Sequence, residues 1–227
     1  MNVGPTFASS NEFKLVVRGK GAHAALPHMG IDPVLAACQV VLAWQGIVTR
    51  NKRPTDTAVI STTMMHAGEA TNVIPDQCVV EGTVRTFTTE VLDLIERRMK
   101  VVAEATCTAH EAQAEFSFKR NYPPTVNHRH ETEFVRRTLA GVVGAGNVLE
   151  FEPTMTAEDF SYMLQAVPGC YFLIGNGDGA HRVPGHGMGP CTLHNPSYDF
   201  NDELIPLGAT AWVHIAEEWL RAPSPAR

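Results

Sequence analysis

The stretch FKLVVRGKGAHAALPHMGIDPVLAACQVVLAW, residues 13–44, sets the pattern for the first half of the chain. Its first six residues alternate loosely between apolar and polar and end at a glycine, which predicts a strand over residues 13–18. Asp32 and Pro33 carry two signals that open a helix, a capping side chain and a proline in the first turn. The apolar run behind them predicts a helix that extends to about residue 48.

The residues that follow continue this alternation of strands and helices. Residues 57–65 are rich in Thr, Val and Ile, and CVVEGTVRTF at residues 78–87 alternates, so we expect two strands that pair as a hairpin. Residues 89–109 carry apolar side chains at helical spacing, and residues 114–119 alternate again. The order strand, helix, strand, strand, helix, strand predicts an α/β ferredoxin-like (βαββαβ) domain over residues 12–120.

The remainder, residues 121–222, has a different pattern. We expect helices over about 131–143, from about 156 to 166, and over about 202–220, with a single strand at residues 169–174. One strand is too little sheet for a self-contained α/β domain, so this segment is interpreted as half of one. Residues 1–11 and 223–227 are predicted to be linker and tail.

Composition excludes several classes of protein. The net charge is −6, which gives no basic footprint for nucleic acid. No apolar run reaches the ~18 residues of a membrane span, so we expect no membrane partner. Five cysteines without a CxxC pair are typical of reduced thiols, which predicts a cytoplasmic location.

Two candidate residues lie in turns beside strands. His23 follows the first strand in a Gly- and Ala-rich loop, where an ordinary exposed histidine competes with a donor to a substrate oxygen. Asn72 lies in TNVIP between two strands. Asparagine is favoured in turns for its own backbone bonds, but its amide can also contact a bound carbonyl.

Two further candidates carry chemistry of other kinds. Arg85 lies within a predicted strand, and if Val84 faces the core, Arg85 faces the opposite side. There it is either a solvated arginine or a guanidinium that holds a carboxylate through two parallel bonds. His194, in LHNPSYDFND, is either structural or a metal ligand with polar neighbours.

Four motifs occur in the order found in the M20 metallopeptidases: GKGAHAALPHMGIDP, TNVIP with GTVRTF, AEDFS with PGCYF, and LHNPSYDFND. Over residues 4–220 the chain resembles the amidohydrolase branch of that family, with hippurate hydrolase, N-acyl-amino-acid amidohydrolases and the plant auxin-conjugate hydrolases. The resemblance implies a lid and dimerisation domain at residues 12–120 and the C-terminal part of a catalytic domain at 121–222. It also implies two divalent metal ions, zinc or manganese, an N-acyl amino acid substrate, and a homodimer formed through the lid.

The resemblance assigns a role to each candidate residue. His23 matches the lid histidine that reaches the active site of the partner subunit and polarises the scissile carbonyl. Asn72 and Arg85 match substrate contacts, with the arginine at the substrate carboxylate. His194 matches a metal ligand.

The chain also departs from the family pattern. It contains neither the Cys-Gly-His-Asp segment nor the Glu-Glu pair expected before the lid, and of the family's metal ligands it keeps only His194. A catalytic zinc needs about three protein ligands. We therefore expect an N-terminally truncated amidohydrolase that is inactive alone.

The alternative is a non-catalytic dimerisation or binding module, or an enzyme remnant. In either case we expect a dimer formed through the lid, with a second segment that exposes apolar surface where partner strands are missing.

Overall fold

The computed structural model describes residues 1–182 and 192–221, so the predicted tail at 223–227 lies outside the described residues. The chain divides into two compact units. The first, called here the sheet unit, consists of Pro5–Val126 and Glu152–Val167. The second, the helical unit, consists of Met1–Gly4, Asn127–Phe151 and Pro168–Arg227. Each unit is described by itself.

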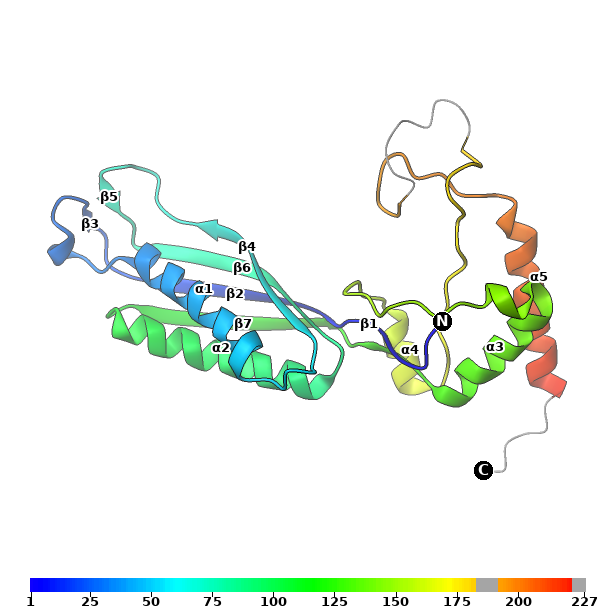
Figure 1. The fold of residues 1–227 in the computed structure, drawn as a ribbon. Coiled ribbons are helices and arrows are strands. Elements are labelled where there is room, and N and C mark those ends of the chain that lie inside the picture. Colours follow the sequence, from blue (N-terminus) through cyan, green and yellow to red (C-terminus); the bar gives the residue numbers. More distant parts are fainter. Residues whose placement is uncertain (183–191, 222–227) are drawn as a thin grey trace. The chain divides into compact units, whose positions relative to one another are not determined.

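The sheet unit has the predicted ferredoxin-like order of elements, and the prediction of this fold is confirmed. Its sheet has the strand order β4-β6-β2-β7 with antiparallel pairs, and two helices cover one face (Figure 1). The elements are β2 (Ser10–Arg18), α1 (Pro33–Arg50), β4 (Ala58–His66), β6 (Gln77–Thr86), α2 (Thr89–Ala109) and β7 (Gln113–Tyr122).

The core of this unit lies between the sheet and the two helices. Alternate residues of β2 and β6 are buried, as expected for strands with one covered face. Trp44 of α1 is fully buried at the centre, and its indole N–H donates to the Met99 carbonyl of α2 (2.9 Å). Its ring also meets Phe13 edge-on, with centroids 5.0 Å apart. One tryptophan thus joins both helices to the sheet.

Helix α1 begins as its sequence predicts. The Asp32 carboxylate accepts hydrogen bonds from the Val34 N–H (2.8 Å) and the Leu35 N–H (3.3 Å), and Pro33 occupies the first turn. The helix is long and apolar enough to resemble a membrane span by composition. Its inner face is instead packed in the core, where Val40 and Trp44 are fully buried.

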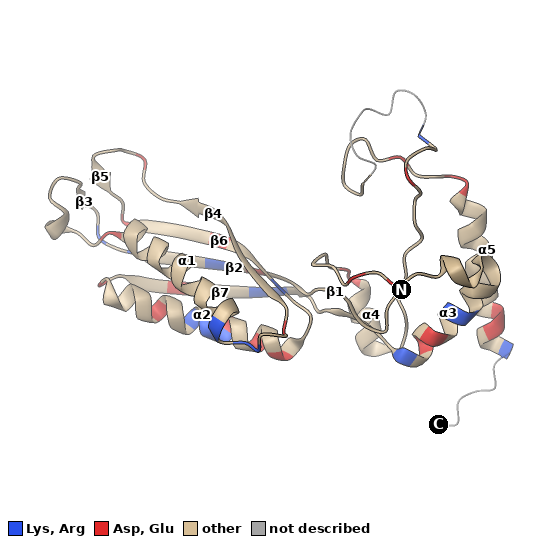
Figure 2. Cartoon of the chain, in the orientation of Figure 1, with Lys and Arg blue, Asp and Glu red and all other residues tan. Residues whose placement is uncertain are grey.

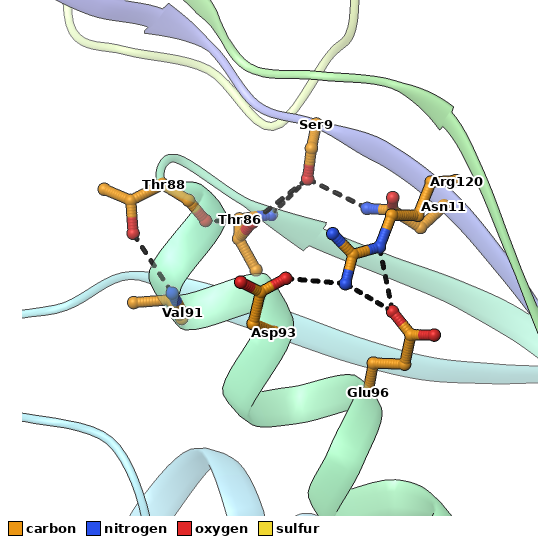
Figure 3. A network of polar contacts seen from close by, with 8 residues as sticks. All are labelled: Ser9, Asn11, Thr86, Thr88, Val91, Asp93, Glu96 and Arg120. Carbon is orange, nitrogen blue, oxygen red and sulfur yellow. Dashed lines mark hydrogen bonds and ion pairs between the residues drawn. The ribbon is translucent and has the colours of Figure 1, made fainter.

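A polar network holds the region where β2 begins and β6 ends (Figure 3). The Ser9 and Thr86 hydroxyls lie 3.1 Å apart, and the Asn11 amide donates to the Ser9 hydroxyl (2.9 Å). Beside it, Arg120 of β7 pairs with Asp93 (2.7 Å) and Glu96 (2.5 Å) of α2. These hydrogen bonds and ion pairs join segments that are far apart in the sequence and so fix this end of the sheet.

Residues 1–11, expected as linker, contain ordered structure. Strand β1 (Gly4–Phe7) pairs with β8 (Thr125–Asn127), and β2 already begins at Ser10. The short helix α4 (Phe160–Ala166) also belongs to the sheet unit. Backbone bonds between residues 6–8 and Thr154 explain the order of this segment.

The helical unit is built on α3 (Arg129–Val143), the short turn η2 (Ala145–Asn147) and α5 (Leu204–Arg221). Phe134 and Leu139 of α3 pack with Ala211 of α5 in a small core, and the Phe134 ring meets Trp219 edge-on. The helices predicted from the sequence are present.

The strand predicted at residues 169–174 is not formed, and that prediction is wrong for the described residues. A strand needs a neighbour, and the structure pairs this segment with none among residues 1–182 and 192–221. The Asn127 side chain instead binds the backbone of Tyr171 at both its N–H (2.7 Å) and its carbonyl (2.8 Å). Large apolar side chains remain exposed in this unit, including Leu173 (53%) and Trp212 (62%).

Candidate functional site

The first candidate region is the tip of the sheet unit, defined as residues 19–31 and 70–76. It contains β3 (Ala22–His23), β5 (Val73–Ile74) and the 3₁₀ turn η1 (Pro27–Met29). Strands β3 and β5 pair so that His23 lies opposite Val73. The Ala24 N–H donates to the Asn72 carbonyl (3.0 Å). The tip thereby brings His23 and Asn72, which are far apart in the sequence, next to each other.

The imidazole of His23 is held in one tautomer. The Ala25 N–H donates to its Nδ1 (3.1 Å), so Nδ1 is the acceptor and the proton of the neutral ring lies on Nε2. The residue is exposed. His23 therefore offers an N–H donor to a ligand.

The backbone of the tip is closely packed at its glycines. A Cβ at Gly30 would lie 2.6 Å from the Lys20 carbonyl oxygen and 2.7 Å from the Ala22 Cβ. Because Gly30 has no side chain, Lys20 and Ile31 can exchange two backbone hydrogen bonds of 2.9 Å. The Gly- and Ala-rich loop that carries His23 is therefore closed by backbone pairing.

Asp76 is a positioning residue of the tip that the sequence reasoning missed. Its carboxylate accepts from the Gly21 N–H (2.8 Å), and its carbonyl accepts from the Gly19 N–H (2.8 Å). The only sequence signal was its place after Pro75, at the start of a strand. Such a residue is recognisable only once the loop it closes is known.

Arg85 lies on the uncovered face of the sheet, as the alternation with Val84 predicted. Its guanidinium is half-buried and donates to the Ser9 carbonyl (3.3 Å). Among the described residues no acidic side chain pairs with it, whereas nearby Lys14 and Glu81 pair at 3.1 Å. Arg85 lines a groove of about 540 Å³ on this face. Its donors are therefore available to an anionic ligand.

His23 and Arg85 lie at opposite ends of the sheet unit. The tip adjoins the end of β2 where Arg18 pairs with Gln77, while Arg85 lies eight residues further along β6. At ~3.3 Å per residue, that length of strand spans ~26 Å. A substrate the size of an N-acyl amino acid cannot contact both groups of one protomer.

His194 lies in the helical unit and is exposed, with a left-handed backbone (φ 66°). Around it, the Asn195 side chain accepts from the Ser197 N–H (2.9 Å), and the Asp199 carbonyl accepts from His181 Nε2 (3.0 Å). Within residues 1–182 and 192–221, no three His, Cys, Asp or Glu side chains converge to hold a metal ion. The described residues therefore do not fit a complete metal centre.

Comparison with known proteins adds independent evidence. Residues 8–111 match the model of the peptidase dimerisation domain M20_dimer. The chain is 35% identical over 221 residues to IAA-amino acid hydrolase ILR1-like 4 of Arabidopsis thaliana, covering 96% of this chain and 49% of that protein. It is 38% identical over 205 residues to N-acetyl-L-cysteine deacetylase of Bacillus subtilis (strain 168), covering 90% and 46%.

A solved structure shares the fold. The Bacillus subtilis YXEP protein, described as a dinuclear metal binding peptidase from the M20 family, aligns with a TM-score of 0.75 and 27% identity. The alignment covers 98% of this chain and 53% of that one. The chain thus spans about half the length of the relatives it matches.

Proposed function

Because this chain belongs to the M20 peptidase family through its dimerisation domain at residues 8–111, we propose that it acts within an amidohydrolase that cleaves N-acyl amino acids. In this proposal the sheet unit supplies the dimer contact and a catalytic side chain. The helical unit supplies part of the catalytic domain. A hippurate-like substrate, with an acyl group on an amino acid, has the amide and the carboxylate that the site residues require.

The observation that carries this proposal is the fixed tautomer of His23. An Nε2–H donor on an exposed imidazole can stabilise the oxyanion that forms when an amide carbonyl is attacked. The donor is already oriented by the Ala25 N–H, so little reorganisation is needed when substrate binds. Asn72, beside it, has a side-chain amide that can contact the same ligand.

Arg85 supplies the second part of the proposed site. A guanidinium without an acidic partner among the described residues can bind the substrate carboxylate through two parallel hydrogen bonds. Binding at the carboxylate would orient the amide for attack. Because ~26 Å of strand separates Arg85 from the tip, His23 would act on a substrate held by the Arg85 of a second copy.

A homodimer follows from this arrangement, and the two edges of the sheet indicate where it forms. Edge strand β7 carries Glu115, Lys119 and Arg120, and such charges protect an edge from pairing. Edge strand β4, with the sequence AVISTTMMH, has no acidic residue, lysine or arginine. Its neighbour α1 exposes Leu35 (51%) and Leu42 (66%). We therefore place the contact between copies at β4 and the exposed face of α1.

Figure 2 supports this choice of surface. Helix α1 is tan along almost its whole length, whereas α2 carries both red and blue segments. An interface core is depleted of charged side chains, as α1 is. The charged helix α2 is suited to face solvent.

The proposed metal chemistry depends on more than the described residues. In the proposal, His194 supplies one ligand to a dinuclear centre like that named for the YXEP protein, with zinc or manganese as the candidate metals. The described residues do not complete such a site.

The second candidate is a dimerisation or binding module without catalysis. The absence of a three-ligand cluster among residues 1–182 and 192–221 favours it. In this case the β4 and α1 surface would still pair two copies, and Arg85 would remain a carboxylate site.

Hydrolysis of N-benzoylglycine by the purified chain, with and without added Zn²⁺ or Mn²⁺, separates the two candidates. Metal-dependent turnover that is lost in His23→Ala but kept in His28→Ala would support the enzyme. His28 is the matched control because it is an exposed histidine on the same tip. No turnover with either metal would support the module.

A mixing experiment tests the shared site. If His23→Ala and Arg85→Ala are each inactive, heterodimers of the two contain one intact site out of two. Random mixing of a two-fold symmetric dimer then restores about a quarter of the wild-type activity. A mixture as inactive as its parents would show that both residues act within one protomer.

A further inference from the structure

Three large apolar side chains are exposed on the tip that carries His23. Leu26, Met29 and Val73 are 50%, 59% and 51% exposed. In the core of the same unit, Leu15 and Met99 are fully buried. Exposed apolar side chains that cluster at one place indicate a contact surface, whereas single exposed apolar residues are common on any protein.

The register of the tip places Val73 beside His23. The two residues lie opposite each other in the antiparallel pair of β3 and β5. Side chains of opposite residues project from the same face, with Cβ atoms about 5 Å apart. Whatever accepts a hydrogen bond from His23 therefore lies within reach of the Val73 methyl groups.

Leu26 and Met29 are fixed to the same structure. The Leu26 N–H donates to the His23 carbonyl (2.8 Å), and the Met29 N–H donates to the Leu26 carbonyl (3.1 Å). Leu26 is the cap residue of the 3₁₀ turn, and Met29 is its last residue. Both residues are thus tied by their backbones to the turn that follows His23.

The charged residues of the tip, Lys20 and Asp76, lie where its two segments join the sheet, and the part around His23 carries none. Residues 21–31 and 70–75 contain no aspartate, glutamate, lysine or arginine. Figure 2 accordingly draws β3 and the turn that follows it in tan. A carboxylate that moved into this surrounding would lose its hydration without gaining an ionic partner.

We propose that Leu26, Met29 and Val73 form an apolar collar around His23 that selects substrates with an apolar acyl group. This inference rests on the proposed role of His23 as the donor to the scissile carbonyl. The acyl group is bonded directly to that carbonyl, so it is the part of the substrate that the collar contacts. The carboxylate end is assigned to the Arg85 of the second copy.

The ratio of kcat/KM for N-benzoylglycine to that for N-acetylglycine tests the collar. We expect Val73→Thr and Leu26→Ser each to lower this ratio about fivefold or more, because lost apolar contact weakens binding of the larger acyl group in the transition state. Val101→Thr is the matched control: Val101 lies on α2, away from the tip, and is 45% exposed. Its ratio should equal that of the wild type.

A second readout needs no turnover. In chain labelled with ¹³C at methionine and valine methyl groups, N-benzoylglycine should shift the Met29 and Val73 signals, and N-acetylglycine should shift them less. The Val101 signal serves as the reference. The methyl groups report binding directly, whatever the chain does catalytically.

The outcomes distinguish the collar from the proposed function. Turnover with an unchanged substrate ratio in both variants overturns the collar and leaves the hydrolase intact. No turnover, but selective methyl shifts with N-benzoylglycine, supports the collar while removing the hydrolase. No turnover and no methyl shift overturns the collar.

Discussion

Substitution of Gly30 by alanine should open the tip without unfolding the sheet unit. Gly30 has an extended backbone (φ −122°, ψ −174°), so alanine suffers no conformational strain there. Its new Cβ would lie 2.6 Å from the Lys20 carbonyl oxygen and 2.7 Å from the Ala22 Cβ. Both neighbours are part of the packed hairpin, so the two segments must move apart.

The size of the effect follows from the contacts that would be lost. Separation breaks the two hydrogen bonds between Lys20 and Ile31, each 2.9 Å long. At ~1 kcal/mol for each bond, the tip should open more easily by ~2 kcal/mol. Amide hydrogen exchange at these two residues should then accelerate ~30-fold, since 1.4 kcal/mol corresponds to a factor of ten.

The matched control is Gly46→Ala in α1. A Cβ at Gly46 meets no atom within 4 Å, and alanine is favoured over glycine in a helix interior by ~1 kcal/mol. We expect Gly46→Ala to raise the unfolding temperature and to leave exchange at the tip unchanged. Hydrogen exchange followed by NMR measures both variants. Unchanged protection of Lys20 and Ile31 in Gly30→Ala would refute the account of the tip as a closely packed hairpin.

Two further predictions concern the surfaces of the sheet unit. Leu42→Lys on the exposed face of α1 should shift a dimer toward monomer in light scattering, because a charge would be buried at the contact. Val101→Lys on α2 should leave the mass unchanged. Equal masses for the two variants would show that the contact between copies does not lie on α1. Burial raises the pKa of the Cys78 and Cys107 thiols and also blocks access to them, while Cys38 is exposed. At pH 8 a disulfide reagent should therefore label Cys78 and Cys107 only on unfolding. Cys38 shares the α1 face of Leu35 and Leu42, so it should react faster in the Leu42→Lys monomer than in the dimer. Rapid labelling of the buried pair in the native chain would contradict the packing described.

Local signals were sufficient to predict the sheet unit. The capping group of α1, the helical spacing of residues 89–109 and the alternation in β6 each depend on neighbours in the sequence. Their order then restricts the topology to few choices, and the antiparallel ferredoxin-like sheet is one of them. The structure has that sheet.

The failures concern contacts between distant residues. The composition of residues 169–174 favours a strand, but a strand exists only when another backbone pairs with it. The glycines of the tip look like flexibility in sequence, and only the approach of residues 30 and 31 to residue 20 shows that they allow close packing.

The candidate site residues also divide into features set by neighbours in the sequence and features set by three-dimensional contacts. The side of β6 on which Arg85 lies follows from alternation, and the sequence predicted it. The tautomer of His23 depends on the direction of one backbone N–H, which no sequence pattern reports. For His194, the sequence identified a residue type suited to a metal, but a metal site requires several such residues to converge.

The pairing of β2 with β7 has a consequence for how this domain is carried between proteins. Along the chain, β2 is the first strand of this four-stranded sheet and β7 is the last, and Ser10 lies opposite Tyr122. The chain therefore enters and leaves the domain through neighbouring backbones, about 5 Å apart. A module with adjoining ends can be inserted into a surface loop of a host at a small entropic cost and removed without leaving a gap. The ferredoxin-like sheet is therefore suited to insertion into other proteins as a complete domain.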